Sequence, residues 1–242
     1  MKQILSYGGG ICSSGMILHL LRNKPEIDLV IHADTQEERN TTYKTVPQIE
    51  KFCNQMNIPF KVVQSDLGNL YDYFFSKKKI MSVMKRDCTS KFKIRPMRRF
   101  IREKFGKYEK FEMMIGFTAE EWHRISKSDV QYISNKYPMI KDKVTKIDCI
   151  KLLKKYKITA SKSACKGCIF TKKKEWIKML LTKKKEFKRH LDLELNCNRY
   201  PEVTINQNYR LIDIKKNWEN QKLLDSYVDN EPNCDVMGSC FL

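Results

Sequence analysis

Residues 2–22 read KQILSYGGGICSSGMILHLLR, and this stretch decides the fold. A short apolar segment runs into three glycines at 8–10, and an apolar run at helical spacing follows Ser13 and Ser14. The pattern predicts a strand, a glycine turn and a helix. Glycines let the backbone approach an anion, and a helix N-terminus adds positive potential. An ordinary tight turn before a capped helix is the alternative, but this first βα junction favours a phosphate or nucleotide site.

The following residues continue the alternation of strands and helices. Residues 28–32 (DLVIH) read as a buried strand, 42–56 as a helix with one apolar face, and 59–64 (PFKVVQ) as a strand. Residues 94–104 read as a helix, and 111–115 (FEMMI) as a fourth strand. This order predicts an α/β fold with a doubly wound, mostly parallel sheet and helices on both faces. Ligands of such sheets bind at the carboxyl ends of the strands.

The periodicity is weaker in the second half of the chain. Residues 148–156 read as a short helix, 172–195 as one or two charged helices, and 210–214 as an edge strand or extended arm. We therefore expect a nucleotide-binding α/β domain at residues 1–130. A helical, cysteine-bearing C-terminal region at residues 131–242 would pack on it.

The composition indicates which partners and which cellular compartment to expect. The chain has 47 Lys and Arg against 28 Asp and Glu, a formal net charge of +19. This excess indicates a polyanionic partner, nucleic acid first, although a lysine-rich proteome would give the same number. Neither a signal peptide nor a membrane span is visible, so we expect a soluble cytoplasmic protein without a membrane partner. The oligomeric state is left open, a homodimer included.

The nine cysteines favour metal or redox chemistry over a disulfide framework. Cys165 and Cys168 form a CxxC pair in SACKGCIF, which can hold a metal ion or cluster or act as a dithiol redox pair. Cys88 and Cys149 are further candidate ligands, although either can be a buried structural thiol. Four thiolates would close a zinc or [4Fe–4S] site, and three would leave one iron open.

Charged residues accompany these motifs. Asp34 ends the second predicted strand, where a carboxylate can hold Mg²⁺ or contact a ribose, and a helix cap is the other interpretation. A basic run that includes Lys91, Lys93 and Arg95 would attract phosphate or sulfate. Arg124, shortly after the fourth strand, can form an ion pair one helical turn away or clamp a substrate.

Five motifs in this order resemble the PP-loop superfamily of adenine nucleotide α-hydrolases. The branch that they resemble is the phosphoadenosine phosphosulfate (PAPS) reductase-like group, including the small versions common in phages and mobile elements. The resemblance covers roughly residues 2–180. The motifs are SYGGGICSS at 6–14, HADT at 32–35, DCTSKFKIRP at 87–96, IGFTAEEWHRI at 115–125 and SACKGCIF at 163–170.

The resemblance implies an adenine nucleotide, ATP or PAPS, at the carboxyl edge of the sheet. The residues expected to bind it are Ser6, Gly8, Gly9, Gly10, Ser13, Ser14, Asp34, Gly116 and Arg124. It also implies an iron–sulfur cluster on Cys88, Cys165 and Cys168, with Cys149 as a fourth ligand or one iron open. Cys240 matches by position a tail cysteine that acts as nucleophile in PAPS reductases without a cluster. The chain departs from the family at Cys12, where many ATP-using members have aspartate, and it lacks their lysine near the glycines.

Three functions follow as hypotheses. The first is an adenine-nucleotide-dependent sulfur-transfer enzyme that thiolates tRNA or DNA with a [4Fe–4S] cluster and a sulfur donor. The second is a PAPS or adenylyl-sulfate reductase that uses a thiol reductant and releases sulfite. The third is a non-catalytic nucleotide- or nucleic-acid-binding protein with a structural zinc. The sequence favours the first.

Overall fold

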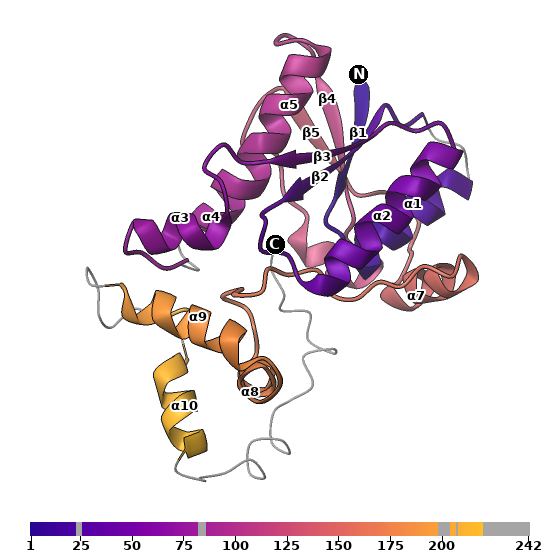
Figure 1. Ribbon diagram of the computed structural model, residues 1–242. Helices are drawn as coiled ribbons and strands as arrows, with labels where there is room; N and C mark the ends of the chain where they lie inside the picture. The colour runs from indigo at the N-terminus through magenta and orange to yellow at the C-terminus, as the bar shows by residue number, and fades with distance from the viewer. Residues whose placement is uncertain (23–25, 82–85, 198–203, 207, 220–242) are drawn as a thin grey trace. The chain divides into compact units, whose positions relative to one another are not determined.

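The strands of this protein form a parallel sheet. The computed structural model describes residues 1–22, 26–81, 86–197, 204–206 and 208–219. In this part of the chain five strands pair in the order β3-β2-β1-β4-β5, every pair parallel (Figure 1). The strands are β1 (Lys2–Tyr7), β2 (Leu29–Asp34), β3 (Phe60–Gln64), β4 (Phe111–Ile115) and β5 (Ile133–Lys136).

Helices cover both faces of this sheet, which confirms the doubly wound α/β fold. Side chains of β1 alternate between the faces, so Leu5 and Ile4 belong to two different apolar clusters. Leu5 packs with residues of α1 (Ile11–Arg22), α2 (Asn40–Gln55) and α7 (Lys146–Lys155), whereas Ile4 packs with Ile101 of α5 (Arg95–Phe105). The elements named in this paragraph are visible around the sheet in Figure 1.

The strand order fixes where a ligand binds. From β1 the chain adds β2 and β3 on one side, and β4 and β5 are on the other. The order therefore reverses between β1 and β4, and the crevice beyond their carboxyl ends is the topological switch point at which open α/β sheets bind ligands. The glycine turn at residues 8–10 and Gly116 follow directly on these two strand ends.

The chain forms two compact units. The sheet unit consists of residues 1–66 and 91–165, and the helical unit of residues 67–90 and the part after 165. Residues 131–165, expected in a separate C-terminal region, belong to the sheet unit because they contribute β5, α6 (Pro138–Lys141) and α7.

The helical unit has its own aromatic core. It contains α3 (Leu70–Ser76), α4 (Asp87–Thr89), α8 (Lys173–Thr182), α9 (Lys184–Leu195) and α10 (Leu211–Glu219). Trp176 is fully buried against the rings of Phe187 and His190, and the Tyr71 hydroxyl donates to the Arg189 carbonyl at 2.8 Å. These contacts join α3, α8 and α9 into one unit.

One local prediction was wrong, and one strand was missed. Residues 210–214 are not a strand, because α10 begins at Leu211, whose N–H donates to the buried Glu194 carboxylate at 2.8 Å. The short β5 was not predicted, although it pairs with β4. A π-helical turn, η1 (Ser90–Ile94), precedes α5. No helix in the described residues is both long and apolar enough to cross a membrane.

Candidate nucleotide site at the carboxyl edge of the sheet

Close packing requires glycine at two positions of the turn after β1. Gly9 has φ +75°, and a Cβ on it would lie 2.5 Å from Cγ2 of Thr42. A Cβ on Gly10 would lie 2.8 Å from the Ser163 hydroxyl oxygen. A Cβ on Gly8, by contrast, would lie 3.7 Å from the hydroxyl oxygens of both Ser13 and Ser163. The space above Gly8 is therefore bounded by two hydroxyl groups and is the size of a small substituent.

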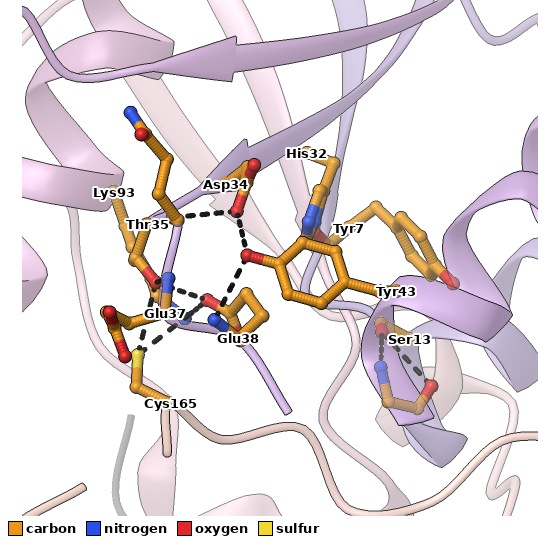
Figure 2. Close-up of polar contacts among 12 residues, drawn as sticks. Tyr7, Ser13, His32, Asp34, Thr35, Glu37, Glu38, Tyr43, Lys93 and Cys165 are labelled. Atoms are coloured by element: carbon orange, nitrogen blue, oxygen red, sulfur yellow. Dashed lines mark hydrogen bonds and ion pairs between the residues drawn. The ribbon is translucent and has the colours of Figure 1, made fainter. Parts of the chain in front are cut away.

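The first turn of α1 contacts the glycine turn. The Gly10 N–H donates to the Ser13 hydroxyl at 3.2 Å, and that hydroxyl lies 3.3 Å from the Gly10 carbonyl (Figure 2). Gly116, at the end of β4, approaches so closely that its Cβ would be 2.9 Å from Cα of Ser13. Both predicted positions, Ser13 and Gly116, thus meet at the switch point.

Two other predicted hydroxyls are engaged elsewhere. Ser14 is fully buried, and its hydroxyl is 3.1 Å from that of Tyr7. Burial raises the pKa of Tyr7 well above its usual range, so this pair is neutral. The Ser6 hydroxyl lies 3.9 Å from the Met97 sulfur. The structure therefore uses Ser14 and Ser6 for internal contacts beneath the site.

Asp34 organises the turn after β2. One oxygen accepts from the Gln36 N–H at 2.8 Å and from the Tyr43 hydroxyl at 3.1 Å (Figure 2). The other oxygen accepts from the Gln64 amide at 3.0 Å. Burial, followed by the Asp34 charge, raises the pKa of Tyr43, which keeps the phenol protonated as a donor. The carboxylate already has three protein donors, so we do not assign Mg²⁺ to it.

His32, which was not among the predicted site residues, lies next to the glycine turn. Its Nδ1 is 2.9 Å from the Tyr7 carbonyl, which makes Nδ1 the protonated nitrogen. Burial lowers the pKa of His32, so the ring is neutral at pH 7. Its Cε1 would be 3.6 Å from a Cβ on Gly9. The HADT motif was the available signal, but only its aspartate was selected.

A buried polar cluster lies beside this turn (Figure 2). The fully buried Glu38 accepts from the Thr35 hydroxyl at 3.1 Å and pairs with the Lys93 ammonium at 3.0 Å. The Cys165 thiol points at the same carboxylate oxygen at 3.7 Å and lies 3.4 Å from the Thr35 hydroxyl. The structure therefore brings together two predicted residues, Lys93 and Cys165, through Glu38, which was not predicted.

Arg124 contributes a buried positive charge. It lies in the 3₁₀ helix η2 (Ala119–Arg124) after β4, pairs with Glu121, and stacks its guanidinium 4.0 Å from the centre of the Phe117 ring. Only 6% of its side chain is exposed, and its Nη2 has no hydrogen-bond partner in the described residues. A buried guanidinium nitrogen without an acceptor fits an anionic ligand.

The thiols fall into two groups. Three of the predicted ligands are partly exposed: Cys165 in the sheet unit, and Cys88 and Cys168 in the helical unit. Cys149 is fully buried with its sulfur 3.8 Å from that of Met139, and burial raises its pKa to about 12. Cys149 is thus a core thiol, and we leave it out of the ligand set.

The remaining predicted residues have other positions. Burial raises the pKa of the Cys12 thiol to about 11, so this position is neutral. Lys91 lies in η1, where its carbonyl accepts from Ser65 at 3.1 Å, and Arg95 begins α5. Cys240 lies outside the described residues. Among the described side chains, no three His, Cys, Asp or Glu residues form a group that could hold a metal ion.

Comparisons with known proteins give one family. The family model of the phosphoadenosine phosphosulfate reductase domain matches residues 2–161. No curated protein sequence matches. Among solved structures, the U34-tRNA thiolase NcsA from Methanococcus maripaludis with its [4Fe-4S] cluster is similar at 11% identity and a TM-score of 0.43. The match covers 90% of this chain and 80% of that one, and a likeness this distant carries no conclusion about activity.

Proposed function

The chain belongs to the phosphoadenosine phosphosulfate reductase domain family, and on this premise we propose that it is an adenine-nucleotide-dependent enzyme that transfers sulfur to tRNA or DNA. One observation carries the proposal: Cys165, two residues after a serine that packs on the glycine turn, reaches the buried pair of Glu38 and Lys93. The same short segment thus carries a thiol and a serine hydroxyl that lies against the glycine turn.

The nucleotide would bind at the switch point. The space above Gly8 would take a phosphate or sulfate oxygen, and the buried Arg124 would neutralise part of its charge. The neutral Cys12 thiol at the start of α1 adds no negative charge there. In the reaction, a carbonyl oxygen of the acceptor base would attack the α-phosphorus of ATP and release pyrophosphate. Hydrosulfide-level sulfur would then displace AMP, which leaves a thiocarbonyl without net electron transfer.

The thiols that we propose as cluster ligands are Cys88, Cys165 and Cys168. Thiolates are the ligands that iron–sulfur clusters and zinc prefer, and these three are partly exposed, unlike Cys149. A bound [4Fe–4S] cluster with an open iron would supply sulfur at the hydrosulfide level. Glu38 and Lys93 would hold the Cys165 side chain in place by the contacts given above.

The net charge of +19 supports a nucleic-acid acceptor. Phosphate contacts of Lys and Arg side chains provide most of the affinity for nucleic acid, and they weaken as salt is added. We therefore expect the affinity for tRNA or DNA to fall steeply between 50 and 200 mM salt (about 10³-fold for six contacts).

A second function is favoured by the family itself. A PAPS reductase would use a cysteine thiolate to displace adenosine bisphosphate from the sulfate sulfur, which leaves an S-sulfocysteine. A thiol reductant would then release sulfite and form a disulfide. The space above Gly8 would hold a sulfate oxygen as readily as a phosphate oxygen.

The test uses the full chain, purified without oxygen and with its iron, sulfide and zinc measured. Pyrophosphate release and thionucleoside formation are followed with ATP, a sulfide donor and either tRNA or DNA, and sulfite release is followed with PAPS and a dithiol. We expect thiolation with one nucleic acid, its loss in Cys165→Ser, and its retention in the core variant Cys53→Ala. Sulfite without thiolation would favour the reductase. If neither product forms and the protein holds one zinc ion, the result would favour the non-catalytic function.

A further inference from the structure

Residues 159–164 form a strap across the N-terminal ends of α1 and α2. The Ser161 carbonyl accepts from the Ile11 N–H at 3.2 Å at the start of α1. The Ala164 carbonyl accepts from the Arg39 N–H at 3.1 Å just before α2. The Thr159 carbonyl accepts from the Thr45 hydroxyl at 2.7 Å. The strap is therefore held at three points along its length.

Two backbone donors at the glycine turn are already bonded within the chain. The Ile11 N–H is bonded to the strap, and the Gly10 N–H is bonded to the Ser13 hydroxyl. These two N–H groups lie where a glycine turn leading into a helix would present donors to an anion. Side-chain donors would therefore add to the backbone N–H groups that remain for an anion here.

Ser163 is placed to supply one. Its hydroxyl oxygen lies 2.8 Å, and its backbone nitrogen 3.0 Å, from the position that a Cβ on Gly10 would occupy. The same hydroxyl oxygen and that of Ser13 each lie 3.7 Å from the point that a Cβ on Gly8 would occupy. Within the described residues the Ser163 hydroxyl has no hydrogen-bond partner, whereas that of Ser161 donates to Thr41 at 2.8 Å.

Another hydroxyl nearby, which is buried, also lacks a partner in the described residues. Thr42 is 1% exposed and packs its methyl group on Gly9, and its oxygen has no hydrogen-bond partner in the described residues. Buried hydroxyls are normally bonded to protein, water or ligand. The surroundings of the glycine turn are thus short of acceptors, as expected of a site completed by an anion.

We propose that Ser163 is a ligand-binding residue of the nucleotide site, and that its hydroxyl donates to a phosphate or sulfate oxygen seated above Gly8. This inference rests on the proposed function, because it takes the occupant to be the anionic part of an adenine nucleotide. It also explains why residue 10 is glycine: a side chain there would displace Ser163 from the turn.

Binding of inorganic pyrophosphate, ATP and PAPS to the full chain, measured by titration calorimetry, tests the proposal. Ser163→Ala removes the hydroxyl and should weaken binding by roughly tenfold or more, because a hydrogen bond to a charged group is lost. Ser163→Asp places a negative charge at the same point and should abolish binding. Ser161→Ala is the matched control on the same strap, with its hydroxyl bonded to Thr41, and should bind within about twofold of the natural chain.

The outcomes separate the two proposals. Thermal unfolding of each variant checks that the strap stays folded. If Ser163→Ala binds pyrophosphate as tightly as the natural chain, the inference is wrong even if ATP binds. If the natural chain binds pyrophosphate but neither nucleotide, and Ser163→Ala weakens that binding, Ser163 stands and the proposed function fails. If the natural chain binds none of the three anions, both fail.

Discussion

The buried pair of Lys93 and Glu38 offers the sharpest test of how the site is held together. Lys93→Met removes the ammonium group that lies 3.0 Å from a fully buried carboxylate, and it keeps much of the apolar stem. The carboxylate then keeps the Thr35 hydroxyl as a donor, but it has lost its cation. We expect a large fall in the free energy of unfolding at pH 7.

The size follows from the geometry. Two unit charges 3.0 Å apart attract by about 5 kcal/mol at an effective dielectric constant of 20. The Lys93 side chain is 21% exposed, so water weakens this attraction, whereas the fully buried Glu38 cannot recover hydration when its partner is removed. Removing one partner of a buried pair typically costs 3–5 kcal/mol, and the partial exposure places the expected loss at about 3 kcal/mol.

The assay is urea denaturation followed by circular dichroism. Lys2→Met is the matched control, because Lys2 pairs with Asp28 at 2.8 Å but its side chain is 47% exposed, and we expect nearly unchanged stability. The double variant of Lys93→Met and Glu38→Gln should recover part of the loss, since no unpaired charge is then buried. A loss in Lys93→Met no larger than in Lys2→Met, or strictly additive losses in the double variant, would refute the reasoning.

Three further outcomes are expected. In urea denaturation, Gly9→Ala should lower the free energy of unfolding by about 2 kcal/mol or more, and Gly68→Ala by about 1 kcal/mol. Both glycines have positive φ, but only a side chain on Gly9 would meet Thr42. Adding Thr42→Ser should therefore restore part of the stability that Gly9→Ala loses. The free energy of unfolding should fall as the pH drops from about 6.5 towards 5, because burial lowers the pKa of His32 in the folded state and the unfolded chain then binds the extra proton. An equal dependence of the free energy of unfolding on pH in His32→Gln would contradict this. Cys149, with a pKa of about 12, should resist iodoacetamide at pH 8 in native protein and react in urea, as mass spectrometry would show.

The strands and the glycine turn could be predicted because their causes are local. Residues 111–115 form β4 as expected, since a short segment of four apolar residues and one glutamate closed by glycine is typical of a buried strand. The boundaries of β2 and α2 also lie within two residues of the prediction. By contrast, Leu211 begins a helix because Glu194, far away in sequence, accepts its N–H, and no local pattern contains that information.

The candidate site was predictable only in part for the same reason. Glu38 was not among the predicted site residues, and it is fully buried where Lys93 and Cys165 reach it from distant parts of the chain. Each of those two was selected, but for phosphate and for metal chemistry. Sequence spacing indicates which residues carry reactive groups, and only the fold shows which of them share one carboxylate oxygen.

The glycines at 8–10 therefore carry two kinds of information. Gly9 and Gly10 are required because Thr42 and the strap pack against them, whereas a Cβ on Gly8 would make only ordinary van der Waals contacts with the hydroxyl oxygens of Ser13 and Ser163. A glycine-rich motif is usually interpreted through the approach of the ligand. Here two of the three glycines allow close approach of the chain to itself, and two nearby backbone N–H groups, those of Gly10 and Ile11, are bonded within the chain. Recognition of the anion would then combine the remaining backbone N–H groups with hydroxyl and guanidinium groups, and substitution can remove these side-chain groups one at a time.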